Sequence, residues 1–176
     1  MLKIGYLGPE GTYSSHAAKL YNDENLKIPF NTINEVLNSL KSMDTDKVIV
    51  PLENSINGSI VEVLDFLASK NSFHIIAELN IEINHSIYSL DKIHLDNVEV
   101  VYSHPQALAQ CYDYLIDNFK NAKHKASNST ADSYNDLINS KEKGVFIGPP
   151  WMKEQEGIIV MGENIQSVKN LSLIHI

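Results

Sequence analysis

Residues 50–60 read VPLENSINGSI, and this stretch decides the fold because an apolar run, 47–52, ends there in small polar residues before a helical pattern begins. Apolar side chains then recur at helical spacing, so we expect an amphipathic helix over 59–68 with Ser59 near its N-cap. A strand, a polar loop and a helix N-terminus can bind an anion, since free backbone N–H groups and the positive end of the helix dipole face it. The alternative is a capped turn, because Ser and Asn are common capping residues.

Similar junctions follow three other expected strands. GPEGTYSSH begins after Leu7, SHPQ after Tyr102 and SNSTA after Ala126. Ligands of open α/β sheets bind beyond the carboxyl ends of the strands. We therefore expect the four loops to meet at one crevice that binds a small anion.

Strand and helix patterns alternate along the chain, which predicts an α/β fold with largely parallel sheets. Strands are expected at 2–7, 47–52, 75–83, 98–102 and 145–147, with weaker ones at 28–30 and 158–161. Helices are expected at 15–21, 34–42, 59–68, 105–119 and 131–140. The run 75–90, IIAELNIEINHSIYSL, is long and has no helix break, as expected of a strand that crosses from one lobe to another.

The composition is that of an ordinary globular protein, with 176 residues, 43% of them hydrophobic and 20% charged. A net charge of −8 without a basic cluster argues against nucleic acid and anionic membranes as partners, and no apolar segment reaches the length of a membrane span. The single cysteine, Cys111, suits a reducing compartment, and we expect the cytoplasm. All 14 basic residues are lysines, so no guanidinium can bind a carboxylate in bidentate fashion.

Other chemistry has weaker support. The seven histidines show no zinc-ligand spacing, and most are interpreted as surface or packing residues. Cys111 shares an apolar helical stripe with Leu108 and Leu115, which favours packing over a nucleophilic role. Glu10 and Glu53 could act as acid or base, but loop carboxylates are more often solvated.

The motifs together resemble the prephenate dehydratase family. They are IGYLGPEGTYSSHAA, VPLENSINGSIVEVLDFL, VYSHPQALAQC, NSTA and GENIQ, in the order and spacing of that family, and they cover essentially the whole chain. The resemblance implies a fold similar to a type II periplasmic binding protein, with two α/β lobes around a cleft. The first lobe would be residues 1–76 with 154–176, and the second 77–153.

The resemblance also implies an activity, the conversion of prephenate to phenylpyruvate in phenylalanine biosynthesis, with no metal or organic cofactor and a homo-oligomeric full-length form. Residues with implied catalytic roles are Asn54, Gln110 and Ser172. Residues with implied substrate-binding roles are Thr12, Ser55, Ser103, His104, Ser129 and Thr130. Alternatives are a non-catalytic anion-binding relative, a prephenate decarboxylase and an arogenate dehydratase.

Two departures from the family pattern concern the end of the chain. Family members carry Thr-Arg-Phe shortly after the segment similar to ENIQ, whereas SVKNLSLIHI follows Gln166 here. Ser172 could take the place of the threonine and Lys169 could supply a charge, but Leu173 and Ile174 replace the arginine and the phenylalanine. The ACT regulatory domain is also missing, so feedback inhibition by this chain is not expected. We therefore expect a truncated or altered copy with weak or no activity.

Overall fold

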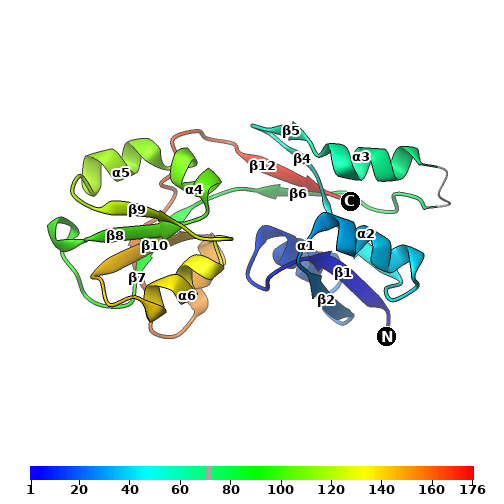
Figure 1. Ribbon diagram of the computed structural model, residues 1–176, viewed down its shortest axis with the longest axis horizontal. Helices are drawn as coiled ribbons and strands as arrows, with labels where there is room; N and C mark the ends of the chain where they lie inside the picture. The colour runs from blue at the N-terminus through cyan, green and yellow to red at the C-terminus, as the bar shows by residue number, and fades with distance from the viewer. Residues whose placement is uncertain (70–72) are drawn as a thin grey trace. The chain divides into compact units, whose positions relative to one another are not determined.

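The computed structural model describes residues 1–69 and 73–176, and their contacts divide the chain into two compact units (Figure 1). The first unit is Met1–Ile83 with Asn170–Ile176, and the second is Asn84–Lys169. Strands and helices alternate in both units, so the predicted α/β class is confirmed.

The first unit contains two sheets. One is parallel with strand order β2-β1-β3, and the other is antiparallel with strand order β5-β4-β12-β6. The strands of the parallel sheet are β1 (Lys3–Leu7), β2 (Leu26–Phe30) and β3 (Lys47–Ile49). Those of the antiparallel sheet are β4 (Pro51–Asn54), β5 (Gly58–Ser59), β6 (Leu79–Glu82) and β12 (Ser172–His175). The helices of this unit are α1 (Tyr13–Tyr21), α2 (Ile33–Lys41) and α3 (Val61–Ala68).

The second unit contains one mixed sheet with strand order β11-β7-β10-β8-β9, in which β10, β8 and β9 are parallel. Its strands are β7 (Ser86–Ser89), β8 (Val100–Ser103), β9 (Lys123–Ala126), β10 (Gly144–Gly148) and β11 (Ile159–Gly162). Its helices are α4 (Pro105–Gln110), α5 (Tyr112–Asn118) and α6 (Asp132–Asn139), with short 3₁₀ turns at Leu95–Asn97 and Pro150–Glu154.

Both faces of the second sheet are covered, because every residue of β10 is buried. Val145 and Ile147 pack on one face with Leu115 and Cys111, whereas Phe146 packs on the other face with Leu137. Burial raises the pKa of the Cys111 thiol to about 12. Cys111 is therefore a core residue, and the packing interpretation is confirmed.

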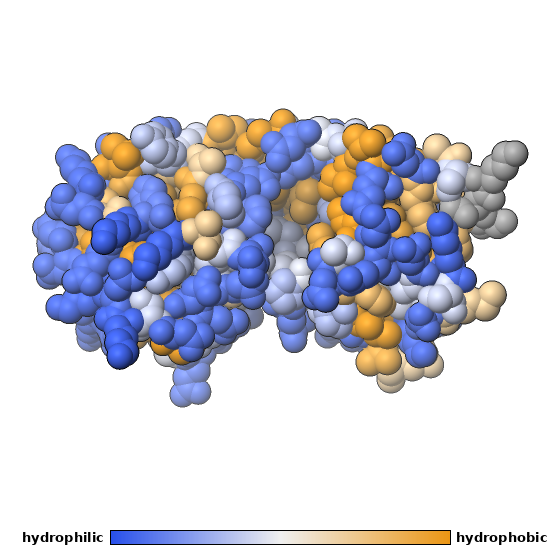
Figure 2. Space-filling model, viewed as in Figure 1, coloured by the Kyte–Doolittle hydropathy of each residue, from blue (hydrophilic) through white to orange (hydrophobic). Residues whose placement is uncertain are grey.

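The helix expected over 59–68 begins two residues later than predicted. Ser59 lies in β5, which pairs with β4, and the N-cap of α3 is Ile60, which has no side-chain capping bond. A hairpin therefore separates the strand from the helix, and Ser59 is not the cap. The apolar stripe of α3 is also only partly covered, since Val61 is 65% exposed and Leu64 is 42% exposed, and Figure 2 shows apolar side chains at the surface over α3.

Long-range hydrogen bonds account for two further differences from the prediction. The helix expected over 105–119 is two helices, because the carbonyl oxygen of Gln110 accepts a bond from the Ser167 N–H (2.7 Å) and the backbone turns at Cys111. Residues 154–169, assigned from the sequence to the first lobe, lie in the second unit, because β11 pairs with β7. The run 75–90 contains two strands, β6 in the first unit and β7 in the second.

The packing around Gly144 gives a test of this core. A methyl group at Gly144 would lie 2.6 Å from Val100 Cγ1 and 2.7 Å from Leu137 Cδ1, which is too close for carbon atoms. We expect Gly144→Ala to lower the free energy of unfolding by about 1–3 kcal/mol, measured by urea denaturation, because a filled core must shift to accept it.

The control for this substitution is Gly157→Asn. Gly157 has a φ of 82° and nothing within 4 Å of an added Cβ. Asparagine adopts this region more readily than other residues, so we expect a change within about 1 kcal/mol. Equal stability of Gly144→Ala and the wild type would contradict the described packing.

Candidate functional site

Asn54 ends β4 and shapes the turn that follows it. Its Oδ1 accepts hydrogen bonds from the N–H groups of Ile56 (2.9 Å) and Asn57 (3.3 Å), and the residue is 9% exposed. The amide oxygen of Asn54 therefore stabilises a turn, which is the alternative to anion binding that the sequence left open. Among the described residues Nδ2 has no hydrogen-bond partner, so the amino group of Asn54 is available as a donor.

Ser55 connects this turn to β12. The Ser55 N–H donates to the Ser172 carbonyl oxygen (3.1 Å), and the Ser172 N–H donates to Ser55 Oγ (3.0 Å). Leu173 pairs with Asn54 in the ladder between β12 and β4. Opposed residues of an antiparallel pair share a face and successive residues alternate, so Leu173 lies beside Asn54 while Ser172 lies on the other face.

The Thr12 hydroxyl makes hydrogen bonds to the backbone of the first unit. It is the N-cap of α1, where its Oγ1 accepts from the Ser15 N–H (3.2 Å) and donates to the Pro9 carbonyl oxygen (2.9 Å). Both hydrogen-bonding roles of the hydroxyl are therefore filled locally. Thr12 follows β1, which belongs to a different sheet from Asn54.

The carboxyl ends of β8, β9 and β10 lie at one edge of the second sheet, and two predicted junctions meet there. Ser103 Oγ donates to the Ile147 carbonyl oxygen (3.0 Å), and Ser133 Oγ lies 3.1 Å from the same oxygen and 2.6 Å from the Thr130 carbonyl oxygen. The Ser127 N–H donates to the Ser103 carbonyl oxygen (2.9 Å). The residues after β8 and after β9 are thus held side by side, as the sequence predicted, but the Ser103 hydroxyl is buried and already donates its proton.

The remaining candidates at this edge differ in whether they keep a hydrogen-bond donor for a ligand. Ser129 Oγ accepts from the Asp132 N–H and donates to Asp132 Oδ2, both at 2.9 Å, so it holds the turn that leads into α6. The Thr130 hydroxyl has no hydrogen-bond partner within the described residues. His104 Nδ1 accepts from the Gln106 N–H (3.3 Å), and partial burial lowers the pKa of the imidazole. His104 is therefore neutral at pH 7, and its Nε2 carries a proton that can be donated.

Gln110, the last residue of α4, is 9% exposed and contacts a histidine that the motif analysis did not single out. His85 Nε2 lies 2.7 Å from Gln110 Oε1, and Gln110 Nε2 has no partner among the described residues. Burial lowers the pKa of His85, partly offset by the bond to Gln110. The sequence carries no signal for this pair, because the two residues are 25 positions apart and His85 lies between β6 and β7 whereas Gln110 ends α4.

The candidates thus fall into two groups. Hydroxyls of one group hold the backbone, and these belong to Thr12, Ser55, Ser103 and Ser129. The other group keeps neutral donors that make no bond within the described part of the chain, and it comprises Asn54, His104, Gln110, Thr130 and Ser172. Neutral amide, imidazole and hydroxyl donors can hydrogen-bond the oxygens of a carboxylate without adding positive charge. Glu10 and Glu53, the carboxylates that could act as acid or base, both lie at the surface. Glu10 pairs with Lys19 (3.1 Å), and Glu53 is exposed.

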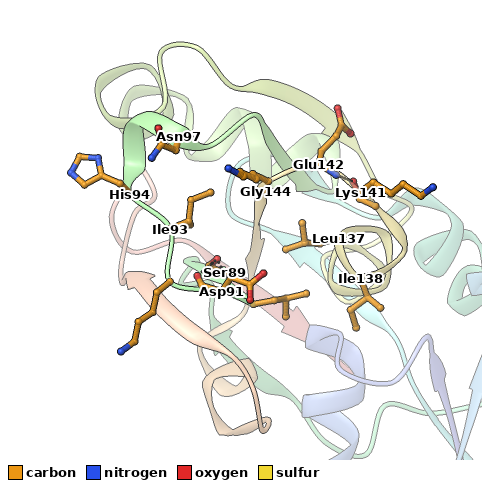
Figure 3. A pocket seen from close by; sticks show the side chains of 14 residues that line it. Ser89, Asp91, Ile93, His94, Asn97, Leu137, Ile138, Lys141, Glu142 and Gly144 are labelled. Carbon is orange, nitrogen blue, oxygen red and sulfur yellow. Dashed lines mark hydrogen bonds between the residues drawn. The ribbon is translucent and has the colours of Figure 1, made fainter.

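A separate pocket of about 440 Å³ lies in the second unit (Figure 3). Its lining includes Ser89 at the end of β7 and Gly144 at the start of β10, with Leu137 of α6 and Lys141. The amino end of β10 is the edge of the sheet opposite to Ser103, so the pocket is distinct from the predicted site, none of whose residues lines it.

The described residues contain no group of three or more His, Cys, Asp or Glu side chains that could hold a metal ion. In the same part of the chain, no helix is both long enough and apolar enough to span a membrane. The fold and the uncommitted donors define an α/β protein with a candidate anion-binding site.

Comparison with known proteins identifies the family. The family model for prephenate dehydratase matches residues 4–172. A bifunctional chorismate mutase/prephenate dehydratase of Buchnera aphidicola subsp. Schizaphis graminum is 40% identical over 142 residues, which are 78% of this chain and 36% of that protein. The prephenate dehydratase of Methanocaldococcus jannaschii is 34% identical over 170 residues, which are 94% of this chain and 60% of that protein. The chain belongs to the prephenate dehydratase family, so the resemblance seen in the sequence is confirmed.

Solved structures agree with this assignment. The crystal structure of a prephenate dehydratase from Arthrobacter aurescens in complex with L-Phe has a TM-score of 0.86 and 26% sequence identity, covering 99% of this chain and 58% of that one. The chain spans 36–60% of the length of these curated relatives.

The two roles of Asn54 can be separated by substitution. We expect Asn54→Ala to lower the free energy of unfolding by about 1–2 kcal/mol, because two backbone N–H groups lose their acceptor. We expect Asn54→Asp to stay within about 1 kcal/mol of the wild type at pH 7, since a carboxylate oxygen accepts the same two bonds.

The matched control is Asn57→Ala, an exposed neighbour in the same turn whose side chain accepts neither bond. It is expected to change stability by no more than about 0.5 kcal/mol. Urea unfolding of all three variants provides the measurement. If Asn54→Ala were as stable as Asn57→Ala, the bonds to Oδ1 would not be holding the turn.

Proposed function

We propose that the chain binds prephenate and converts it to phenylpyruvate, releasing water and carbon dioxide. The observation that carries this proposal is that Asn54 and Gln110, two residues with implied catalytic roles, keep amide donors that the fold does not use. Membership of the prephenate dehydratase family supports the choice of substrate.

The reaction asks the protein for orientation and for one proton. The C–C bond to the ring carboxylate breaks, carbon dioxide leaves, and the electron pair completes the aromatic ring as the C–O bond to the hydroxyl breaks. The departing hydroxyl takes one proton and leaves as water. Aromatisation supplies the driving force, so a donor aimed at the hydroxyl and others that hold the carboxylates would be sufficient.

The uncommitted donors suit these tasks. Prephenate is a dianion, and donors on the protein stabilise its oxygens most when they are held in place before it binds. In the first unit the proposed donor to substrate oxygens is Asn54, and in the second unit the proposed donors are His104, Gln110 and Thr130. Thr12, Ser55, Ser103 and Ser129 would contribute by holding the loops that present those donors.

The primary test is an assay of the chain with prephenate at neutral pH, in which phenylpyruvate is followed above the uncatalysed rate. We expect Asn54→Asp to lose at least about 10²-fold in kcat/KM, because a carboxylate replaces the donor and repels the dianion. Catalysis by Asn54→Asp at the wild-type rate would remove Asn54 from the proposed site. A decarboxylated product that keeps its hydroxyl would indicate a decarboxylase instead, and preferential turnover of arogenate would reassign the substrate.

The family motif missing from β12 provides a gain-of-function test. Leu173 stands opposite Asn54 in the ladder, so an arginine at this position would add a guanidinium beside that amide. We expect the combined variant Ser172→Thr, Leu173→Arg and Ile174→Phe to raise kcat/KM by about 10²-fold or more, since the arginine would add a charged donor on the face of Asn54.

The control for this variant is the single substitution Leu173→Lys. Lysine restores the charge as a point donor without the bidentate geometry, so a smaller gain is expected. Equal rates for the wild type and the combined variant would show that the present β12 already supplies what the reaction needs, with Ser172 in the threonine's role.

A further inference from the structure

Four polar side chains, the buried His85 and Gln110 and the half-buried Asn84 and Gln166, lie close together in the second unit. Gln166 connects two of the others, because its Nε2 donates to Asn84 Oδ1 (2.7 Å) and its Oε1 accepts from the His85 N–H (3.0 Å). The backbone of the same segment is bound on both sides, since the Ile165 N–H donates to the His85 carbonyl oxygen (3.0 Å) and the Ser167 N–H to that of Gln110 (2.7 Å). His85 and Gln110 are therefore held by a common segment.

The hydrogen bond between the side chains of His85 and Gln110 has one direction. The amide oxygen of Gln110 can only accept, so His85 Nε2 must carry the proton and donate it over 2.7 Å. His85 is 2% exposed and Gln110 is 9% exposed, so water does not compete freely for this bond. The bond fixes which end of the Gln110 amide faces away from the histidine, and that end is the NH₂ group, which has no partner among the described residues.

We propose that His85 is a positioning residue that fixes the Gln110 amide with its NH₂ group toward the substrate. This inference rests on the proposed function, in which Gln110 binds prephenate. It assigns His85 no contact with the substrate, because His85 acts through the orientation of its neighbour.

The orientation of the amide matters because the substrate is an anion. A carbonamide presents a donor at one end and an acceptor at the other, and a rotation of 180° exchanges them with almost no change in shape. With NH₂ toward a carboxylate the contact is attractive, whereas with Oε1 toward it two acceptors meet. A neutral histidine with a proton on Nε2 removes the wrong orientation, since the flipped amide would place NH₂ against the imidazole N–H.

Burial keeps His85 in the form that this arrangement needs. Desolvation lowers the pKa of the imidazole, so the ring is neutral at pH 7 and carries a single proton. The backbone bonds of the segment around Gln166 limit how far the two side chains can separate.

The kinetic test compares His85→Gln with His85→Met. The Nε2 of glutamine reaches about as far as that of histidine and can donate to Gln110 Oε1, whereas methionine has a similar length and no donor. We expect His85→Met to lower kcat/KM for prephenate about tenfold, and His85→Gln to stay within about threefold of the wild type. His94→Met, at an exposed histidine lining the pocket of Figure 3, should leave kcat/KM unchanged.

A double substitution separates positioning from general stability. In a Gln110→Met background, a further His85→Met change should cause no additional loss of kcat/KM, because the residue through which His85 acts has been removed. Independent losses that multiply, or a His85→Met enzyme as active as the wild type, would overturn the proposal. Thermal unfolding of each variant shows whether a loss of activity follows a loss of fold.

A measurement on the unmodified chain makes the inference independent of turnover. The ¹⁵N chemical shifts of the histidine rings distinguish protonated from unprotonated nitrogens, and the His85 signals are assigned by their absence from His85→Gln. We expect Nε2 of His85 to be protonated and Nδ1 unprotonated at pH 7. The opposite tautomer would overturn the positioning role even in an active enzyme. Failure of the wild type to form phenylpyruvate, with this tautomer present, would refute the proposed function and leave the orientation of Gln110 supported.

Discussion

A buried hydrogen bond to the carbonyl oxygen of Ile147 joins the ends of two parallel strands in the second unit, because Ser103 at the end of β8 donates to that oxygen (3.0 Å). Ser133 Oγ of α6 lies 3.1 Å from the same oxygen and 2.6 Å from the Thr130 carbonyl oxygen, so its one proton is shared between the two acceptors. A buried carbonyl without a partner would cost about 1–3 kcal/mol. The order of the edge where the candidate residues lie depends on this arrangement.

Small polar residues at strand ends can hold the fold or can offer donors to a ligand, and sequence motifs do not distinguish these two roles. The hydroxyl of Thr12 caps a helix, that of Ser129 holds the turn before α6, and the oxygen of Asn54 shapes a turn. A hydroxyl has one proton to donate, so once it is given to the backbone it is lost to a ligand. An amide has separate donor and acceptor ends, and Asn54 and Gln110 use the oxygen for the fold while keeping the nitrogen. An amide can therefore serve the fold through its oxygen and still offer a donor to a ligand.

The absence of arginine gives these neutral donors greater importance. A net charge of −8 gives the chain no attractive overall field for a dianion and the chain has no guanidinium, so the proposed binding depends on donors placed in advance. Leu173 occupies the ladder position beside Asn54, and its apolar side chain adds no donor there. In the resemblance to the family, the motif's arginine corresponds to Leu173, which connects this position of β12 to the proposed chemistry.

The sequence by itself determined the α/β class, the family, and the positions of elements such as β1, α2 and α6, because periodicity and strand-to-helix junctions are local properties. It also located the polar residues that follow the strands. Only the tertiary structure decided that Cys111 interrupts a helix, that residues 154–169 belong to the second unit, and that Ser59 lies in a hairpin, since each depends on a hydrogen bond between residues distant in sequence or on strand pairing. The pairing of His85 with Gln110 belongs to the same group, because no sequence spacing encodes which side chains meet inside a folded unit.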